Sequence, residues 1–226
     1  MPKKNSPGCK CCCSCSAKDV CILLDTTGSM QGVLENFKII IEELQPLFEN
    51  ESCQWSLVEY KDQFDYGFED GWNVLQTFTS EFQLIIDASK LLNSSGGGDG
   101  PEQQYTSIKL ISEKWESLDG LEGRSHVDFD RVLIWIGEAP GHNGELYSGG
   151  RVYPTRAEVI SALDVAEVKV FALNVRSEFA GIDGQSGIDD LKQQGTVIAE
   201  TSGGQIFHNV TQLQQIKDAL CKALSS

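Results

Sequence analysis

Oxygen-bearing side chains recur at alternate positions in the stretch DTTGSM, which follows the first apolar run of the chain. Asp25, Thr27 and Ser29 supply a carboxylate and two hydroxyls, and Gly28 permits a tight turn between them. Alternate side chains in a nearly extended loop can converge on one point. Oxygen donors of this kind are the ligands that Mg²⁺, Mn²⁺ and Ca²⁺ prefer. Taken alone, the motif is equally compatible with a hydroxyl that caps the following helix.

Two further stretches carry acidic residues at expected loops. Asp99 lies within the glycine-rich string GGGDGPE, and Glu138 lies within IGEAPGH, directly after the apolar run RVLIWI. In parallel α/β sheets, ligands bind outside the carboxyl ends of the strands. Convergence of Asp25, Asp99 and Glu138 there would create a repulsion that a cation relieves.

The elements that must position these residues alternate along the chain. Apolar runs predict strands at residues 20–24, 55–60, 72–78, 131–136, 168–175 and 205–207. Helical periodicity and stop signals predict helices at residues 30–44, 80–92, 101–115, 156–166, 188–201 and 210–224. Ser80 and Gln83 form a capping-box pattern, and Pro101 stands where a first helical residue would be. The alternation predicts an α/β fold with a mostly parallel sheet covered on both faces.

Length and charge restrict the classes of function. The 226 residues suit one α/β domain, and the net charge of −15 would repel a phosphate backbone, so nucleic acid is not an expected partner. No apolar run approaches the roughly 20 residues that a membrane-spanning helix needs. The first residues lack the apolar core of a signal peptide. We therefore expect a cytoplasmic location, with an extracellular one left open.

The cysteines divide the chain at residue 17. Residues 1–17 form a predicted disordered tail with five of the eight cysteines, Cys9, Cys11, Cys12, Cys13 and Cys15. Four interpretations of these cysteines stay open: incidental thiols, a thiolate cluster for a soft metal, interchain disulfides, and acylation that attaches the tail to a membrane. Residues 18–226 form the predicted domain, in which Cys21, Cys53 and Cys221 are expected to be free thiols, commonly buried.

The three stretches together resemble the von Willebrand factor A-type (vWA) family over about residues 18–224. The family's metal-ion-dependent adhesion site has D-x-S/T-x-S in a first loop, usually Thr in a second and Asp after the fourth strand. Here Asp99 stands at the Thr position and Glu138 at the Asp position. The resemblance implies a Rossmann-like three-layer sandwich with a six-stranded, mostly parallel sheet and one antiparallel edge strand. It also implies a metal site formed by Asp25, Thr27, Ser29, Asp99 and Glu138.

The function implied by the resemblance is metal-dependent protein binding. One divalent cation, with Mg²⁺ preferred and Mn²⁺ or Ca²⁺ as alternatives, would be ligated by Thr27 and Ser29. Asp25 would bind it directly or through water, and Glu138 through water. An Asp or Glu of a partner protein would complete the shell.

Two other functions stay open at this point. The acidic site, with His142 nearby, could serve a metal-assisted hydrolase, or the chain could be a structural assembly subunit with a vestigial metal site. The sequence has no HExxH, Ser-His-Asp or P-loop pattern to support catalysis. We therefore expect that the chain is not an enzyme.

Overall fold

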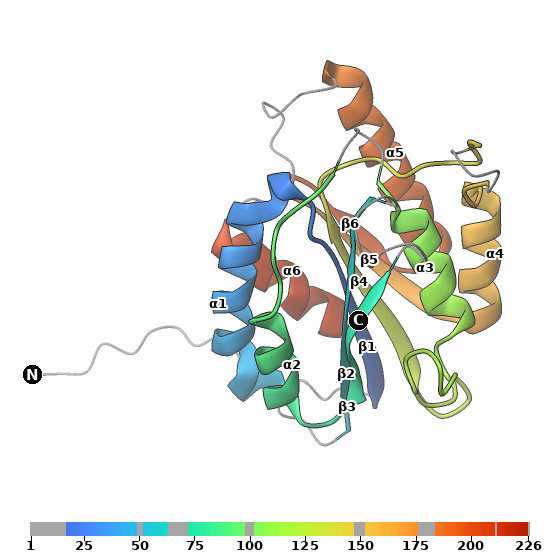
Figure 1. Cartoon of the computed structure of the whole chain (residues 1–226). Helices are drawn as coiled ribbons and strands as arrows, with labels where there is room; N and C mark the ends of the chain where they lie inside the picture. Colours follow the sequence, from blue (N-terminus) through green and yellow to red (C-terminus); the bar gives the residue numbers. More distant parts are fainter. Residues whose placement is uncertain are drawn as a thin grey trace, which may run out of the picture.

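A six-stranded sheet in the order β3-β2-β1-β4-β5-β6 forms the centre of the computed structural model (Figure 1). The structure describes residues 17–48, 52–62, 72–97, 102–146, 152–175, 184–210 and 212–225. The strands are β1 Lys18–Asp25, β2 Gln54–Tyr60, β3 Asn73–Thr79, β4 Asp130–Gly137, β5 Val168–Asn174 and β6 Gln205–Phe207. β3 pairs antiparallel with β2 at one edge, and the other neighbours pair in parallel. The predicted fold class is confirmed.

Helices cover both faces of this sheet. They are the short 3₁₀ helix η1 Gly28–Met30, α1 Gln31–Phe48, α2 Phe82–Ser89, α3 Gln104–Glu113, α4 Arg156–Ala166, α5 Gly184–Thr201 and α6 Leu213–Ser225. Figure 1 shows α1, α2 and α6 on one side of the sheet and α3, α4 and α5 on the other. Each side has its own apolar cluster against the sheet, so the chain forms three layers.

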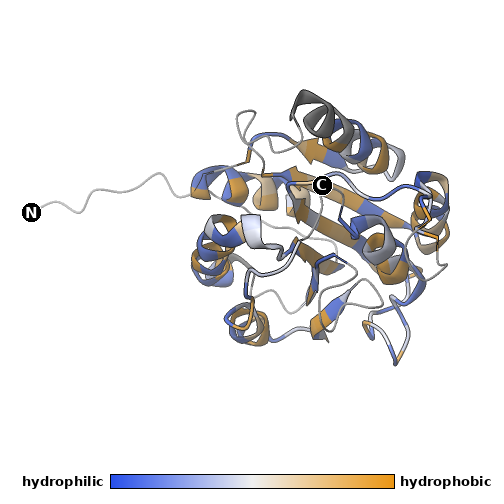
Figure 2. Cartoon of the chain, turned by 45° about the horizontal axis from the view of Figure 1, so that its top comes forward, coloured by the Kyte–Doolittle hydropathy of each residue, from blue (hydrophilic) through white to orange (hydrophobic). Residues whose placement is uncertain are grey.

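The central strands are apolar on both faces because both faces are covered. On β1, Ile22 and Leu24 belong to the apolar cluster beneath α1, whereas Cys21 and Leu23 belong to the cluster beneath α3. Figure 2 shows the consequence, with hydrophobic strands at the centre and helices that are apolar on one side only. This burial explains why β1 and β4 appear in the sequence as continuous apolar runs instead of alternating patterns.

Two predicted signals for helix starts are wrong, and α5 and α6 begin at Gly184 and Leu213 instead of at the predicted residues 188 and 210. Ser80 and Gln83 do not form a capping box, because α2 begins at Phe82 and its N-cap residue, Glu81, makes no side-chain cap bond. The N–H of Glu81 instead donates to the hydroxyl of Thr79 at 3.1 Å. The next helix, α3, begins only at Gln104 because the residues before it bridge to another loop, described below. Pro101 itself lies outside the described residues.

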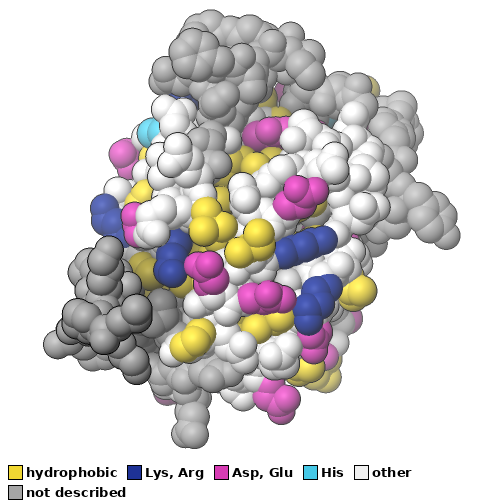
Figure 3. All heavy atoms as spheres, turned by 90° about the vertical axis from the view of Figure 1, so that its left-hand side faces the viewer, with side chains coloured by type: hydrophobic (Ala, Val, Ile, Leu, Met, Phe, Trp, Pro, Cys, Tyr) yellow, Lys and Arg dark blue, Asp and Glu magenta, His cyan; other side chains and the backbone are white. Residues whose placement is uncertain are grey.

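The surface over α1 and α2 carries charges of both signs among scattered apolar side chains, as Figure 3 shows. Exposed ion pairs such as Lys90–Asp87, at 2.8 Å, contribute little to stability. No helix among the described residues is long and apolar enough to cross a membrane. Cys21 and Cys53 are buried free thiols, as predicted, and Cys221 is half-buried. The cysteine-rich residues 1–16 lie outside the described part of the chain.

Candidate metal centre

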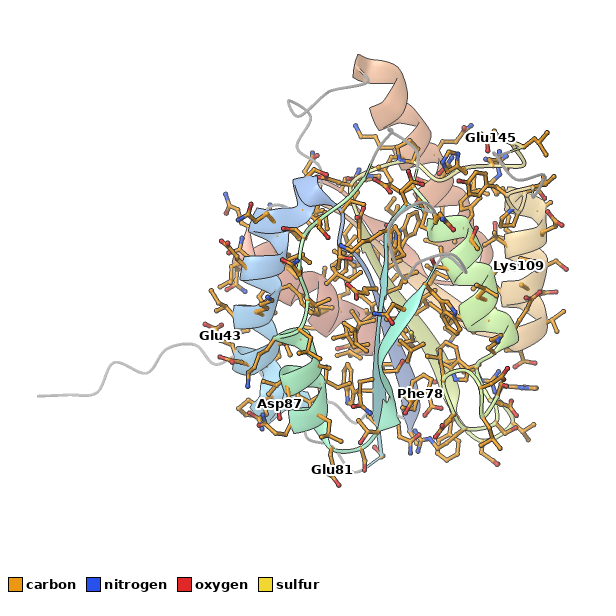
Figure 4. All side chains as sticks on the ribbon, in the orientation of Figure 1. Glu43, Phe78, Glu81, Asp87, Lys109 and Glu145 are labelled. Carbon is orange, nitrogen blue, oxygen red and sulfur yellow. The ribbon has the colours of Figure 1, made fainter. Side chains whose placement is uncertain are left out.

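The carboxyl ends of β1, β2 and β4 meet at one edge of the sheet, the upper edge in Figure 1. In Figure 4 the labelled Glu145 lies near this edge and Glu81 near the opposite one. Asp25 ends β1 beside Tyr60 of β2, and the preceding residue pairs with Ile136 of β4. Glu138 follows the end of β4 directly. The register therefore brings Asp25, Thr27 and Glu138 to the same edge, as the sequence predicts.

Asp25 is fully buried, and hydrogen bonds fix both of its carboxylate oxygens. Oδ1 accepts the backbone N–H of Thr27 at 2.9 Å and the Thr27 hydroxyl at 2.7 Å. Oδ2 accepts the Tyr60 hydroxyl at the longer distance of 3.5 Å. That hydroxyl in turn accepts the indole N–H of Trp135 at 3.1 Å. The side chain of Asp25 is therefore oriented before any ligand arrives.

The charge of Asp25 is held in an unfavourable environment. Burial raises the pKa of Asp25 from 3.8 to about 6, the two bonds from Thr27 oppose that rise, and the negative charge of Glu138 adds to it. Burial also raises the pKa of Tyr60 well above its ordinary value, and the charges of Asp25, Glu102 and Glu138 contribute to that rise. Three carboxylates thus act electrostatically on one buried hydroxyl.

The two hydroxyl residues of the first loop differ in exposure. Thr27 is buried and stands at the N-cap position of η1, but its side chain makes no cap bond, because its hydroxyl donates to Asp25. The lone pairs of that oxygen remain available to coordinate a cation. Ser29 is exposed to solvent within η1. The alternative interpretation of Thr27 as a helix cap is therefore not supported.

The second loop brings an additional carboxylate to this edge. Asp99 lies outside the described residues, but Glu102 of the same GGGDGPE string is only 4% exposed. Gly97 has a φ of +81°, and a Cβ there would lie 3.3 Å from Oε1 of Glu102 and 3.1 Å from Cβ of Thr27. The Glu102 side chain therefore reaches the first loop. Sequence reasoning gave Glu102 no role, although its place in the string was a usable signal.

Glu102 also ties the second loop to the third. Its N–H donates to the carbonyl of Pro140 at 2.9 Å, and its carbonyl accepts the N–H of His142 at 3.2 Å. The ring of His142 stacks on Tyr153, with centroids 4.0 Å apart. His142 and Tyr153 therefore pack within their own loop, the ordinary alternative to a role in ligand binding.

The donors at this edge suit a hard cation. Within the described residues, no group of three or more His, Cys, Asp or Glu side chains is arranged to hold a metal ion. The predicted set combines the carboxylates of Asp25, Asp99 and Glu138 with the hydroxyls of Thr27 and Ser29, and Asp99 lies outside the described residues. Carboxylate and hydroxyl oxygens suit Mg²⁺ or Ca²⁺ better than they suit a soft ion.

Comparison with known proteins corrects one expectation. No model of a known protein family matches the chain. The chain is 27% identical over 190 residues to alpha-protein kinase vwkA of Dictyostelium discoideum. The matched region is 80% of this chain but only 26% of that protein. Our expectation that the chain is not an enzyme is contradicted, because a relative named as a kinase points to an enzyme.

Proposed function

We propose that the chain is a vWA-type domain that binds one divalent cation, preferably Mg²⁺, at the carboxyl edge of its sheet. In this proposal the ion binds an Asp or Glu side chain of a partner protein. Thr27, Ser29 and Asp25 would hold the ion, with Glu138 acting through water and Asp99 contributed by the second loop. The ion would supply a positively charged coordination position beside these carboxylates.

The observation that carries this proposal is the contrast between two buried aspartates at opposite ends of β1. Asp19 has a counter-ion within the chain, because its carboxylate accepts the guanidinium of Arg124 at 2.6 Å. The contacts described for Asp25 are with Thr27, Tyr60 and Glu138, none of which is basic. A buried carboxylate without a counter-charge is costly, and a bound cation would supply one.

The overall charge of the chain supports a role for the ion in partner binding. With a net charge of −15, the protein repels acidic surfaces at long range. A partner carboxylate could still bind where a divalent cation reverses the local sign of the potential. The ion would therefore determine both the place and the chemistry of recognition.

We further propose that this recognition serves a kinase-type enzyme, by binding a protein that the enzyme phosphorylates. The supporting observation is the 27% identity to an alpha-protein kinase over 80% of the chain. The cytoplasm is the compartment that we propose for this role. The free thiols Cys21 and Cys53 suit a reducing compartment of that kind.

Thermal unfolding in EDTA, followed by addition of Mg²⁺, Mn²⁺ or Ca²⁺, tests the metal site. An ion at a hundredfold excess over its dissociation constant should add about 2.7 kcal/mol, or about 5–10 °C. Asp25→Ala should lose this response. Asp19→Asn, on the same strand but at the opposite edge, should lose stability and keep the response. A wild-type protein that responds to none of the three ions would refute the metal site.

Partner binding and enzyme activity need separate assays. Immobilised peptides that contain Asp or Glu should bind in Mg²⁺ and dissociate in EDTA, whereas peptides with Asn or Gln at the same positions should not bind. Binding that survives EDTA would exclude the metal-dependent mechanism. Incubation with labelled ATP and captured proteins tests for phosphate transfer, and its absence would refute the kinase-type role while leaving the metal site standing.

A further inference from the structure

Lys61 is a lysine only 6% exposed that directly follows β2 at the edge of the candidate site. Its ammonium donates to three backbone carbonyls: that of Thr26, that of Asn93 at 2.9 Å and that of Ser95 at 3.1 Å. Thr26 lies between Asp25 and Thr27 in the first loop, and the other two precede the glycine-rich second loop. One buried cation therefore connects both loops.

Backbone hydrogen bonds join the same two loops. The N–H of Ser95 donates to the carbonyl of Thr26 at 3.1 Å, and the N–H of Gly28 donates to the carbonyl of Gly96 at 3.1 Å. The Thr26 carbonyl thus accepts from Ser95 and from Lys61. Neutral peptide bonds of this type contribute modestly, whereas bonds from an ammonium are stronger. Lys61 is accordingly the strongest described link between the loops.

The side chain of Thr26 is fixed from a different direction. Its hydroxyl donates to Oε2 of Glu59 at 2.9 Å, and Oε1 of Glu59 accepts the amide of Asn73 at 2.8 Å. Both the side chain and the carbonyl of Thr26 are therefore held by buried charged groups of the β2 segment. The residues on either side of Thr26 are the proposed ligands Asp25 and Thr27.

We propose that Lys61 is a positioning residue of the metal site. It holds Asp25 and Thr27 of the first loop at a fixed distance from Glu102 of the second loop, so that these donors face one ion. The inference rests on the proposed metal-binding function. The hydrogen bonds described for the ammonium go to backbone carbonyls of the first loop and of the segment before the second loop. Groups that orient ligands in this way typically change metal affinity 10–100-fold when they are removed.

Lys61→Met tests this role, because it keeps the length and apolar stem of the side chain and removes the ammonium. Lys38→Met is the matched control, since the part-buried Lys38 donates to the carbonyl of Leu92 at 2.7 Å, just before the second loop. Isothermal titration with Mg²⁺ should give a dissociation constant about tenfold or more weaker for Lys61→Met. Lys38→Met should lower the unfolding temperature in EDTA without changing the dissociation constant.

Amide hydrogen exchange provides a readout at the loops themselves. In Lys61→Met the N–H groups of Ser95 and Gly28 should exchange faster than in the wild type, and in the control they should not. If Lys61→Met fails to fold, Lys61→Gln, which keeps an N–H donor, should still weaken Mg²⁺ binding severalfold.

The outcomes separate this inference from the function on which it rests. Wild-type Mg²⁺ affinity in Lys61→Met, or in Lys61→Gln where that variant is used, would overturn the positioning role and leave the metal site intact. Equal losses of affinity in Lys61→Met and Lys38→Met would reduce Lys61 to a general stabilising residue. No Mg²⁺ binding by the wild type would overturn the proposed function itself.

Discussion

Replacing Asp25 with Asn is expected to stabilise the metal-free protein while it abolishes the response to metal. Burial raises the pKa of Asp25 from 3.8 to about 6, so the folded protein holds a proton there more tightly than the unfolded chain does. The free energy of unfolding therefore falls as the pH rises from about 4 to about 6, and the loss persists above pH 6. The difference between the two pKa values corresponds to about 3 kcal/mol.

An Asn at this position carries no charge to desolvate, and its amide oxygen can still accept both bonds from Thr27. We therefore expect Asp25→Asn to gain about 2–3 kcal/mol at pH 7.5 in EDTA, or about 5–10 °C. The gain is somewhat smaller than the full 3 kcal/mol because the bonds from Thr27 are no longer charge-assisted. At pH 4.5 the gain should shrink to about 1 kcal/mol, because the wild-type carboxyl is then mostly protonated in the folded state. Thermal and urea unfolding at both pH values measure it.

The matched control is a substitution of Asp19, the buried aspartate at the other end of β1. Asp19→Asn removes the charged partner of the half-buried Arg124 guanidinium and should lose about 1.5–3 kcal/mol at pH 7.5. If Asp25→Asn is instead less stable than the wild type in EDTA at pH 7.5, Asp25 is not a carboxylate that lacks a counter-charge. The main argument for a cation site would then fail.

Three further perturbations test neighbouring parts of the site. Below pH 6, protons should compete for Asp25, so the Mg²⁺ affinity measured by titration calorimetry should fall up to about tenfold per pH unit; an affinity that does not change between pH 5 and 7 would contradict this. Gly137→Ala should cost about 1–3 kcal/mol in urea unfolding, because its Cβ would clash with the Tyr60 hydroxyl, whereas Gly32→Ala, with nothing within 4 Å, should be neutral or stabilising. Glu102→Gln should weaken Mg²⁺ binding severalfold in the same calorimetric assay, and an unchanged affinity would exclude Glu102 from the site.

The fold could be predicted because local patterns and global packing agree in the central strands. The stretch VLIWI after Arg131 is apolar throughout, and the structure buries β4 between two helical layers, so length and composition were sufficient. The direction of β3, in contrast, could not be predicted from local patterns. All seven residues Asn73–Thr79 are half-buried, and nothing in that pattern distinguishes an antiparallel edge strand from a parallel one. The antiparallel pairing followed only from the family resemblance.

Helix starts were the least predictable feature, because they depend on contacts that no local pattern reports. The prediction that a helix opens at Pro101 followed a general preference for proline in the first turn. In the structure, the peptide groups of Glu102 already bond to Pro140 and His142 of the third loop, so α3 cannot begin before them. A contact with a loop some 40 residues away in sequence thus decides where this helix starts.

The candidate ligands and the residues that position them differ in what a sequence can reveal. A hard cation needs carboxylate and hydroxyl oxygens, so Asp25, Thr27 and Glu138 stand out by residue type at the ends of predicted strands. Lys61 acts through backbone carbonyls, a group that every residue carries, so no pattern of residue types marks its partners. In the sequence it is one lysine in the acidic string KDQFDYGFED, which is typical of a solvated loop. Only the return of the chain after α2 to the end of β1 buries its ammonium and gives it carbonyls from two loops.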